Sequence, residues 1–400
     1  MRNRLLRRAA RLAAVFTLTA GLAAALAVPA GASELRVYYP DIEQGNSTLL
    51  VSPTGSAMLI DGGSEIRYAD DDLTTFIRDL MDAGVISSLD YIVATHYDED
   101  HIGHLEDVMS YDLLSSTGTI YDRGTYQQTP GSFAYSDYSF AATFYTRSTI
   151  TAGTTISLGG GVSVTCHVVN GTLSDSSSVD ITSSNQFENA ASVGLLVEYG
   201  DFDLWIAGDL TGNVEEYGVA DVEEAVGPLI GDVDVYTVHH HGSRTGSTTD
   251  FLEDITPEVA INQNSADNNF GHPNSIAVDN ILDTLDSCNN TPLFIQQNPG
   301  NSGDTRSDDT LADGIADPDD DDAVLGLPGT ILLVTDGTDF QISGGALAPI
   351  TLPADCSGSV TADFAPNVLQ VSRSPWVPTA AQSTTVAADV RDEGSPTVTL

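Results

Sequence analysis

The sequence predicts an α/β fold, and three patterns support that class. Short apolar runs that are typical of strands recur between residues 34 and 345. An amphipathic helix is expected at residues 70–83, between two of these runs. The run that begins at Leu89 ends in a polar loop, and a helical pattern follows it directly. Strands and helices that alternate along one chain favour sheets covered by helices.

The expected strands are apolar or alternating runs bounded by polar or glycine-containing turns. In chain order they are residues 34–39, 48–51, 57–60, 89–93, 162–169, 193–199, 202–207, 233–238, 258–262, 330–335 and 340–342. The helix at 70–83 has apolar residues three and four positions apart on one face, aspartates at its N-terminal end and Gly84 after it. We expect this helix to cover one face of a sheet.

The first 32 residues have the pattern of a secretory signal peptide. Five arginines lie within residues 1–11, residues 12–28 are almost wholly apolar, and residues 30–32 supply a small-residue cleavage site. We therefore expect a secreted, extracellular protein whose mature chain begins near Ser33 and has no membrane segment. The alternative is a retained membrane anchor, although the apolar run is short for spanning a bilayer.

The chain is strongly acidic. Its 57 acidic and 14 basic residues give a formal net charge of −43, and all the basic residues are arginines. Removal of the five N-terminal arginines would take this charge to −48. The hydrophobic content of 41% is ordinary, which favours a folded protein with a solvated acidic surface over a disordered chain. Such a surface repels nucleic acid at low ionic strength, and salt screens that repulsion.

The three cysteines are too few for a disulfide scaffold. One bridge could join Cys288 and Cys356, which would leave Cys166 as a buried thiol in an apolar strand, but the sequence does not fix this pairing. His167 lies in the same strand, where a lone histidine is more often structural than a ligand.

Four potential metal ligands lie in the loop after the strand at 89–93. His96 and Asp98 are two residues apart in extended chain, so their side chains can face one ion. Asp100 and His101 lie at the turn into the helix and can face a second ion. The spacing therefore predicts two neighbouring metal sites in one loop. Residues 110–157, rich in serine, threonine and tyrosine, are expected to form an insertion near them.

The stretch from His96 to His101 resembles the HxHxDH motif of the metallo-β-lactamase superfamily, with Asp98 in place of its second histidine. Further segments resemble the superfamily domain of bacterial competence DNA-channel proteins. They are the turn at 41–47, in which Glu43 and Asn46 depart from the pattern, the strand end AGD at 207–209, HHGS at 240–243 and GHP at 271–273. The resemblance covers about residues 34–345 and implies an αββα sandwich with the metals at one sheet edge.

The resemblance also implies roles for single residues. Asp209 would bridge two metal ions, and His240 would contact substrate or support the ligands, whereas His239 is expected outside the site. His272 would bind a phosphoryl oxygen or donate a proton. The implied metal ligands are His96, Asp98, Asp100, His101, Asp209 and His241, the catalytic residues are Asp100, His240 and His272, and the supporting residues are Asp61 and Ser243. Asp61 can brace the metal loop by hydrogen bonds, or it can be an ordinary turn residue.

One departure concerns the first metal site. The superfamily usually offers a histidine shortly before the strand that ends in GD, and residues 185–192 contain none. The site would keep only His96, Asp98 and Asp209, an oxygen-rich set that favours harder ions. We therefore expect a two-metal zinc centre, with manganese as an alternative in this weaker site.

Four segments are expected along the chain. They are a signal peptide at 1–32, a hydrolase domain at 33–345, a linker at 346–366, and at 367–400 a partial segment that resembles the first strands of an immunoglobulin-like module. The acidic run at 301–322 is expected to be a solvated loop. A calcium site is the alternative there, but the spacing fits no calcium-loop template.

The expected function follows from the implied metal centre. Two metal ions supply hydroxide from bound water and stabilise developing negative charge. The HHGS and GHP segments favour a phosphodiester, so we expect a secreted phosphodiesterase or nuclease. The alternatives are a lactonase or β-lactamase-type hydrolase and, from another class, a non-catalytic metal-binding module. The expected partner is a phosphodiester or another small anion, with extracellular DNA as a candidate, and no protein partner is evident.

Overall fold

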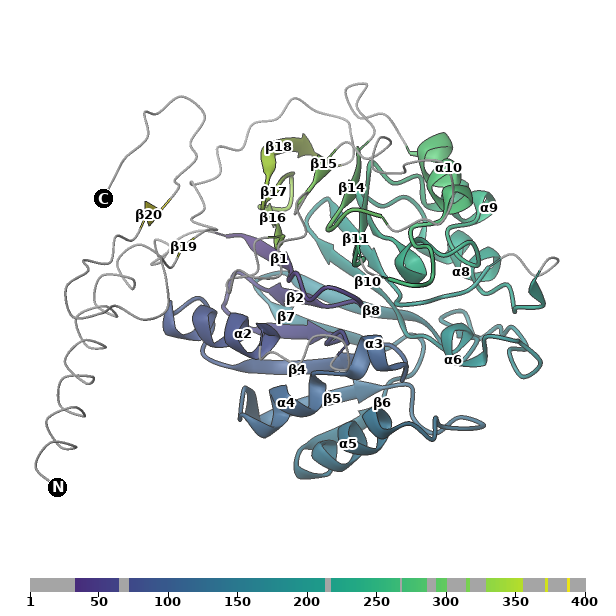
Figure 1. Ribbon diagram of the computed structural model, residues 1–400, viewed down its shortest axis with the longest axis horizontal. Helices are drawn as coiled ribbons and strands as arrows, with labels where there is room; N and C mark the ends of the chain where they lie inside the picture. Colours follow the sequence, from purple (N-terminus) through teal and green to yellow (C-terminus); the bar gives the residue numbers. More distant parts are fainter. Residues whose placement is uncertain are drawn as a thin grey trace, which may run out of the picture.

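The computed structural model contains two facing β-sheets with helices on both outer sides (Figure 1). It describes residues 33–64, 72–212, 217–266, 268–285, 293–300, 314–316, 329–354, 371–372 and 387–388. The expected signal peptide, most of the acidic run at 301–322, and both Cys288 and Cys356 lie outside these residues. No helix in the described part of the chain is long and apolar enough to span a membrane.

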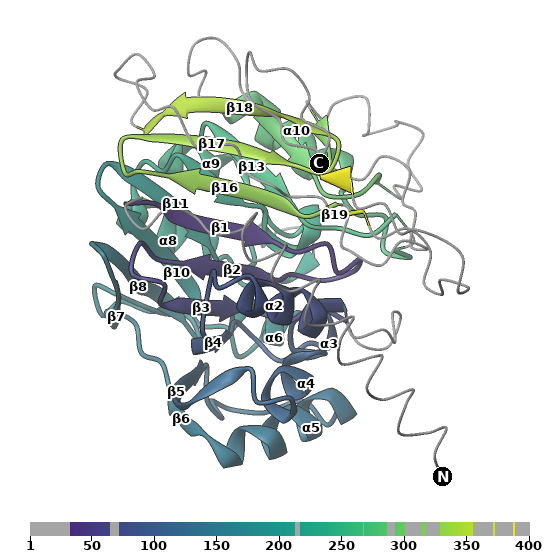
Figure 2. The ribbon, with the colours of Figure 1, turned by 90° about the vertical axis from the view of Figure 1, so that its left-hand side faces the viewer.

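The first sheet has the strand order β18-β17-β16-β1-β2-β3-β4-β5-β6. Its strands are β1 (Leu35–Tyr39), β2 (Thr48–Val51), β3 (Ala57–Ile60), β4 (Leu89–Ala94), β5 (Leu114–Asp122), β6 (Thr146–Thr149), β16 (Ile331–Thr335), β17 (Asp339–Gly344) and β18 (Leu347–Pro353). Figure 2 shows β16, β1, β2 and β3 side by side. The strands from β3 to β6 are parallel, so their C-terminal ends lie at one edge.

The second sheet has the order β15-β14-β13-β12-β11-β10-β8-β7, with β9 beside β8. Its strands are β7 (Thr155–Gly159), β8 (Val162–Val169), β9 (Thr172–Leu173), β10 (Gly194–Tyr199), β11 (Phe202–Ile206), β12 (Val235–Thr237), β13 (Val259–Asn262), β14 (Leu293–Gln296) and β15 (Gly314–Ile315). The strands from β11 to β15 are parallel.

The helices form the two outer layers. Helices α2 (Asp72–Asp82), α4 (Leu105–Ser110) and α5 (Phe133–Ala141) cover the first sheet, and α8 (Glu223–Ile230), α9 (Thr249–Ile255) and α10 (Ser275–Thr284) cover the second. Shorter elements are α3 (Glu99–Ile102), α6 (Phe187–Ala190) and the 3-10 turns η1 (Ala142–Phe144) and η2 (His239–Gly242). The arrangement is the expected αββα sandwich.

Strand residues alternate between two apolar layers, which explains why the strands are apolar on both faces. In β10, Leu195 and Val197 lie in the core between the sheets, and Leu196 between them in sequence packs toward the helices. Successive side chains of a strand point to opposite faces, and both faces of each sheet are covered here.

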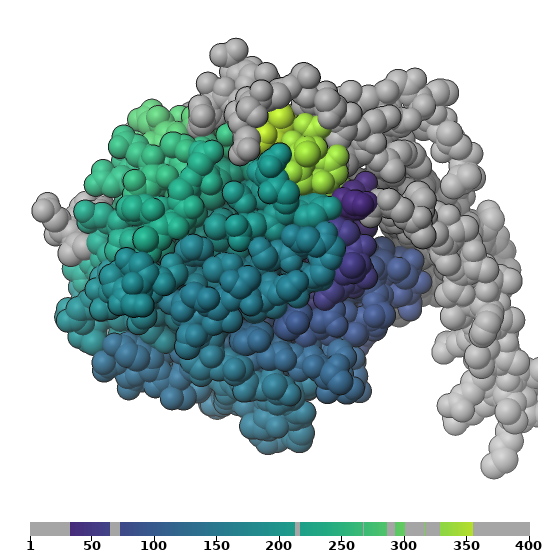
Figure 3. Space-filling model, turned by 180° about the vertical axis from the view of Figure 1, so that it is seen from behind, coloured from purple at the N-terminus to yellow at the C-terminus, as the bar shows by residue number. Residues whose placement is uncertain are grey.

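The domain extends further than the sequence patterns predict. We expected a linker from residue 346, but β18 pairs with β17 in the first sheet, and Leu347 and Leu352 are buried. The proline, serine and threonine content of this stretch hid a strand at the sheet edge, where proline is tolerated. Figure 3 shows the yellow-green residues 329–354, which include β18, beside the purple N-terminal residues of the first sheet. Of the expected immunoglobulin-like segment, the structure describes only the pairing of Val371–Ser372 with Ala387–Ala388.

Residues 110–157 are part of both sheets and do not form a separate insertion. They contain strands β5 and β6 of the first sheet and helix α5, which covers that sheet, and they lead into β7 of the second sheet. The sequence patterns also miss α8, α9 and α10. Helix α8 contains Gly227 and Pro228, and α9 has only seven residues, so neither shows a helical period long enough to detect.

Candidate metal centre

The six expected metal ligands lie where strands of both sheets end at one edge. The loop after β4 carries His96 and Asp98 and continues into α3, which holds Asp100 and His101. Asp209 follows β11, and His241 lies in η2 after β12. Because these strands run in parallel sets whose C-terminal ends meet, residues more than a hundred positions apart come together.

Hydrogen bonds fix how three histidine rings face the site. The Nδ1 of His101 lies 2.8 Å from Oδ2 of Asp61, and the Nδ1 of His241 lies 3.0 Å from the backbone oxygen of Gln263. Both partners are acceptors, so each Nδ1 carries the proton. The hydroxyl of Thr95 donates to Asp61 and therefore accepts from Nδ1 of His96 at 3.2 Å. In the neutral rings, all three Nε2 atoms are left with a lone pair that can bind a cation.

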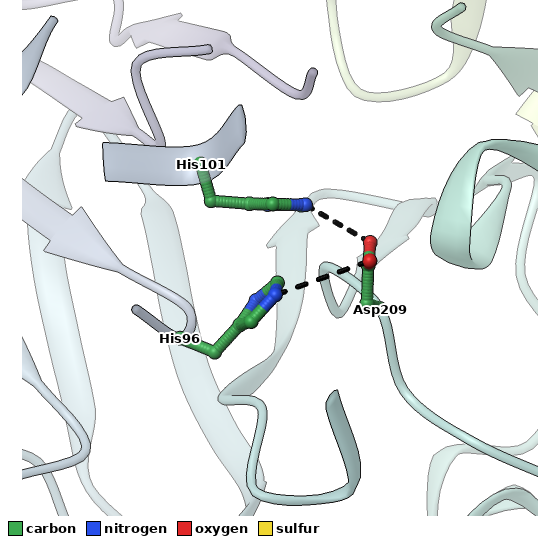
Figure 4. A group of neighbouring side chains, drawn as sticks. All are labelled: His96, His101 and Asp209. Atoms are coloured by element: carbon green, nitrogen blue, oxygen red, sulfur yellow. Dashed lines mark ion pairs between the residues drawn. The ribbon is translucent and has the colours of Figure 1, made fainter. Parts of the chain in front are cut away.

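The three Nε2 atoms converge on the carboxylates of Asp209 and Asp100. The ligand atoms of His96, His101 and Asp209 lie within 4.8 Å of one another, and so do those of Asp100, His101 and His241. Figure 4 shows the rings of His96 and His101 pointing toward Asp209. The Nε2 atoms of the three histidines and Oδ1 of Asp209 are buried without a hydrogen-bond partner in the protein. Buried acceptors arranged in this way fit a cation.

Asp209 belongs to the group of His96 and His101 and also approaches His241 of the other group. Its Oδ1 is 3.0 Å from Nε2 of His101 and 3.7 Å from Nε2 of His241, whereas its Oδ2 is 3.9 Å from Nε2 of His96. The carboxylate of Asp98, 44% exposed, lies 3.6 Å from the same Nε2 of His96. The two oxygens of Asp209 therefore face different groups, which is the geometry that a bridging carboxylate requires.

The charges of the cluster also favour a cation. Burial raises the pKa of Asp209, but the nearby histidines, His240 first, outweigh burial and hold this pKa well below its ordinary value. Burial lowers the pKa of His101, and the carboxylates of Asp209 and Asp61 outweigh burial and raise it well above its ordinary value. Concentrated negative charge therefore surrounds His101, and a divalent cation can displace the proton from its ring.

Asp61 braces the metal loop from the first sheet. Its Oδ1 accepts from the backbone N–H of Thr95 at 2.8 Å, and its Oδ2 accepts from the hydroxyl of Thr95 and the ring of His101. The turn at 41–47 supports the same loop, since the N–H of Asn46 donates to the backbone oxygen of Asp100. A Cβ on Gly45 would lie 2.1 Å from that oxygen, so only glycine permits this approach.

The three histidines of η2 point in different directions. His240 and His241 have left-handed backbone, with φ of 52° and 54°, a strained conformation that often occurs at functional sites. His239 points away from the pocket, and accepts from Trp205 and contacts the buried carboxylate of Glu223. Ser243 contacts His240 only through Thr245. The hydroxyl of Ser243 forms a hydrogen bond with that of Thr245, which lies 3.2 Å from Nδ1 of His240.

His272 borders the same pocket without joining the ligand groups. Its ring lies 5.5 Å from that of His240 and 6.4 Å from that of His241, between centroids. Burial and the two neighbouring histidines lower the pKa of His272 to about 3. The ring is therefore uncharged near neutral pH, which suits a hydrogen-bond donor better than a donor of a full proton.

The family comparison matches the part of the chain that holds the metal loop. Residues 40–111 match the model of the metallo-beta-lactamase superfamily. This part of the chain is therefore similar to that superfamily, and it includes the loop from His96 to His101. The curated relative is ComE operon protein 3 of Bacillus subtilis, 26% identical over 259 residues that cover 61% of this chain. The match spans only 30% of that relative's length.

Similar solved structures include a metallo hydrolase, a metallo-beta-lactamase fold protein and a zinc-bound protein. The metallo hydrolase Igni18 of Ignicoccus hospitalis has a TM-score of 0.33 at 14% identity, over 57% of this chain and 81% of its own. YhfI of Bacillus subtilis has a TM-score of 0.34 at 11% identity, and the similarity covers 56% of this chain and 85% of YhfI. Zn²⁺-bound PqqB of Methylobacterium extorquens has a TM-score of 0.33 at 17% identity, and the similarity covers 54% of this chain and 75% of PqqB.

Asn189 lies beside Asp209, a member of the group that includes His96. Its amide nitrogen is 3.5 Å from Oδ2 of Asp209 and 3.3 Å from Nε2 of His240, and the residue is buried. It lies in the stretch 185–192, where the sequence shows no histidine. An amide therefore lies beside Asp209 in the stretch where the superfamily usually offers a histidine.

Sequence reasoning misses the residues that position the ligands from outside the motifs. Gln263 orients His241 through a backbone oxygen, which any residue type can supply, so no side-chain pattern identifies it. Glu188 accepts from the backbone N–H of Tyr97 at 2.9 Å and pairs with Arg123 at 2.6 Å. A buried arginine after a strand, with an acid elsewhere to neutralise it, is the only pattern that could have suggested this pair. His167 contacts Ser174 and Trp205 and does not line the pocket.

We predict that Asp100→Ala and His241→Ala each lower bound metal by about one equivalent and abolish hydrolysis, because each removes a ligand of the same group. Elemental analysis of protein purified without chelator measures the loss, and circular dichroism checks the fold. His167→Ala is the matched control and should keep the wild-type metal content. Wild-type protein that binds neither zinc nor manganese would refute the metal centre.

We predict that Asn189→His tightens binding of the second zinc equivalent by about tenfold or more, because it adds an imidazole beside Asp209, which belongs to the same group as His96. Competition with a chromophoric chelator measures both equivalents. Asn189→Ala is the control and should leave the tighter equivalent unchanged. Equal affinity of the second equivalent in all three proteins would show that position 189 does not face this ion.

Proposed function

We propose that this protein is a metal-dependent hydrolase, an exported phosphodiesterase that can act as a nuclease, with a domain that extends over residues 33–354. The observation that carries the proposal is the convergence of His240, His241 and His272 on one pocket with the ligand groups. These histidines belong to the HHGS and GHP segments, the two motifs that favour a phosphodiester.

The pocket suits a small anionic ester. Its volume is about 330 Å³, and its lining includes Asp98, Asp100, Asp209, His240 and His272. Pockets of this size accept ligands of nucleotide dimensions. We propose that Asp100, His101, His241 and Asp209 would hold zinc. The group of His96, Asp98 and Asp209 would hold zinc or manganese, because it has more oxygen ligands.

Each side chain has a separate part in the proposed reaction. When bound, the divalent ions supply Lewis acidity and a water activated as a nucleophile near neutral pH. Asp61 and the backbone oxygen of Gln263 keep the ring nitrogens of His101 and His241 directed at the pocket. His272, uncharged and with Nδ1 unpartnered in the protein, is placed to donate a hydrogen bond to a phosphoryl oxygen.

Two alternatives remain as outcomes of a test. A lactonase or β-lactamase-type hydrolase would use the same ligand groups, and a non-catalytic metal-binding module would bind the ions without turnover. Purified protein should be assayed with bis-p-nitrophenyl phosphate, nitrocefin and plasmid DNA, each with zinc and with manganese. Turnover of the phosphodiester alone or together with DNA supports the proposal. Turnover of nitrocefin alone, or of no substrate by metal-loaded protein, overturns it.

We predict that His272→Ala lowers kcat for bis-p-nitrophenyl phosphate by about a hundredfold, the usual effect of losing one donor to a developing charge. Metal content should not change, because His272 lies outside both ligand groups. Steady-state kinetics and elemental analysis on the same preparation measure the two effects. Loss of about one metal equivalent would instead make His272 a ligand.

We predict that DNA cleavage rises from low to roughly physiological ionic strength, where the Debye length falls to about 8 Å. The acidic surface repels a polyanion, and none of the pocket-lining residues is an arginine that would release counterions on binding. The measurement is the apparent second-order rate at fixed divalent metal, with a small neutral ester as the control that should change little. A steep fall with added salt would refute the charge argument.

A further inference from the structure

Phe270 is an exposed aromatic residue at the mouth of the metal pocket. Its side chain lines the pocket together with His272, yet the residue is 66% exposed. The two rings are nearly parallel, with an interplanar angle of 18° and 5.8 Å between centroids. Exposure of a phenylalanine forgoes the free energy that burial of its ring would contribute. One face of this ring is therefore held against His272 without being buried in the protein core.

A buried side chain holds Phe270 in this position. Oδ1 of Asn268 accepts from the backbone N–H of Phe270 at 3.2 Å and from that of His272 at 2.9 Å. The amide nitrogen of Asn268 donates to the backbone oxygens of Ser265 and His272. Asn268 itself is fully buried. The exposed ring is thus presented by a fixed turn, which lowers the entropy lost when a ligand packs on it.

The rest of the pocket lining limits what this ring can bind. The lining contains the carboxylates of Asp98, Glu99, Asp100 and Asp209 and no arginine. One phosphodiester can be neutralised by metal ions, but further phosphates would meet these carboxylates without a positive partner. Affinity for the remainder of a substrate must therefore come from uncharged contacts, and Phe270 offers the largest exposed apolar surface in the lining.

We propose that Phe270 is a stacking platform for an unpaired nucleobase next to the phosphodiester that is hydrolysed. The inference rests on the proposed phosphodiesterase function and narrows its substrate to nucleoside phosphodiesters whose base is free to stack. A base inside a duplex is already stacked and paired, so it would have to leave the helix to reach this ring. Single-stranded DNA or RNA and small nucleoside diesters are then better substrates than duplex DNA.

The test compares two substrates with the same p-nitrophenol leaving group. One is methyl p-nitrophenyl phosphate and the other is the p-nitrophenyl ester of thymidine 5′-phosphate, so that their ratio of kcat/KM reports the contribution of the nucleoside. Phe270→Ala should lower this ratio about tenfold, because a loss of this size lies within the range expected for stacking of one base on an aromatic side chain. Phe270→Trp should keep the wild-type ratio, since it retains an aromatic face.

Phe144→Ala is the matched control. Phe144 is 73% exposed but lies in η1 and does not line the pocket, so its removal should leave the ratio unchanged. The outcomes separate the inference from the function on which it rests. A wild-type ratio near one, or a ratio that is the same in Phe270→Ala, overturns the stacking platform while the phosphodiesterase stands. Hydrolysis of neither substrate by metal-loaded wild-type protein overturns both.

Discussion

The metal centre depends on the buried carboxylate of Asp61. It accepts three hydrogen bonds, two from Thr95 and one from His101. Through the hydroxyl of Thr95 it also determines which nitrogen of His96 carries the proton. One carboxylate at the end of β3 thus orients two ligands of the neighbouring loop. A hydrogen bond to the ring nitrogen that does not bind the metal fixes the orientation of a histidine ligand and raises the basicity of the other nitrogen.

The sequence predicts the fold well because its elements have strong local patterns. Strands β2, β3 and β8 have the expected bounds, since each is an apolar run closed by polar or glycine residues. The short helices over the second sheet and the edge strand β18 escape prediction, because tertiary packing and not local period determines them. The resemblance of the motifs supplies the layer order, which the strand patterns alone would leave open.

The residues of the candidate site are also of two kinds, those that the sequence predicts and those that it does not. His96, Asp98, Asp100 and His101 can be predicted because they are contiguous and follow a strand, and Asp209 and His241 because they end strands in recognisable motifs. Asn189, Gln263 and Asn268 cannot be predicted, since each acts through a backbone atom or a contact made only in the folded chain. Phe270 is visible in the sequence, but only its exposure at the pocket shows that it does not belong to the core.

The two sheets supply the ligands separately, and this has a consequence for how the molecule is held together. His101 and Asp100 come from the first half, and Asp209 and His241 come from the second, more than a hundred residues further along. An ion bound between them closes a long loop of chain, as a disulfide would, in a protein with three cysteines, of which Cys166 is a free, buried thiol. Ion binding and the association of the sheets are then linked equilibria, so free metal concentration sets how firmly this edge of the sandwich is closed.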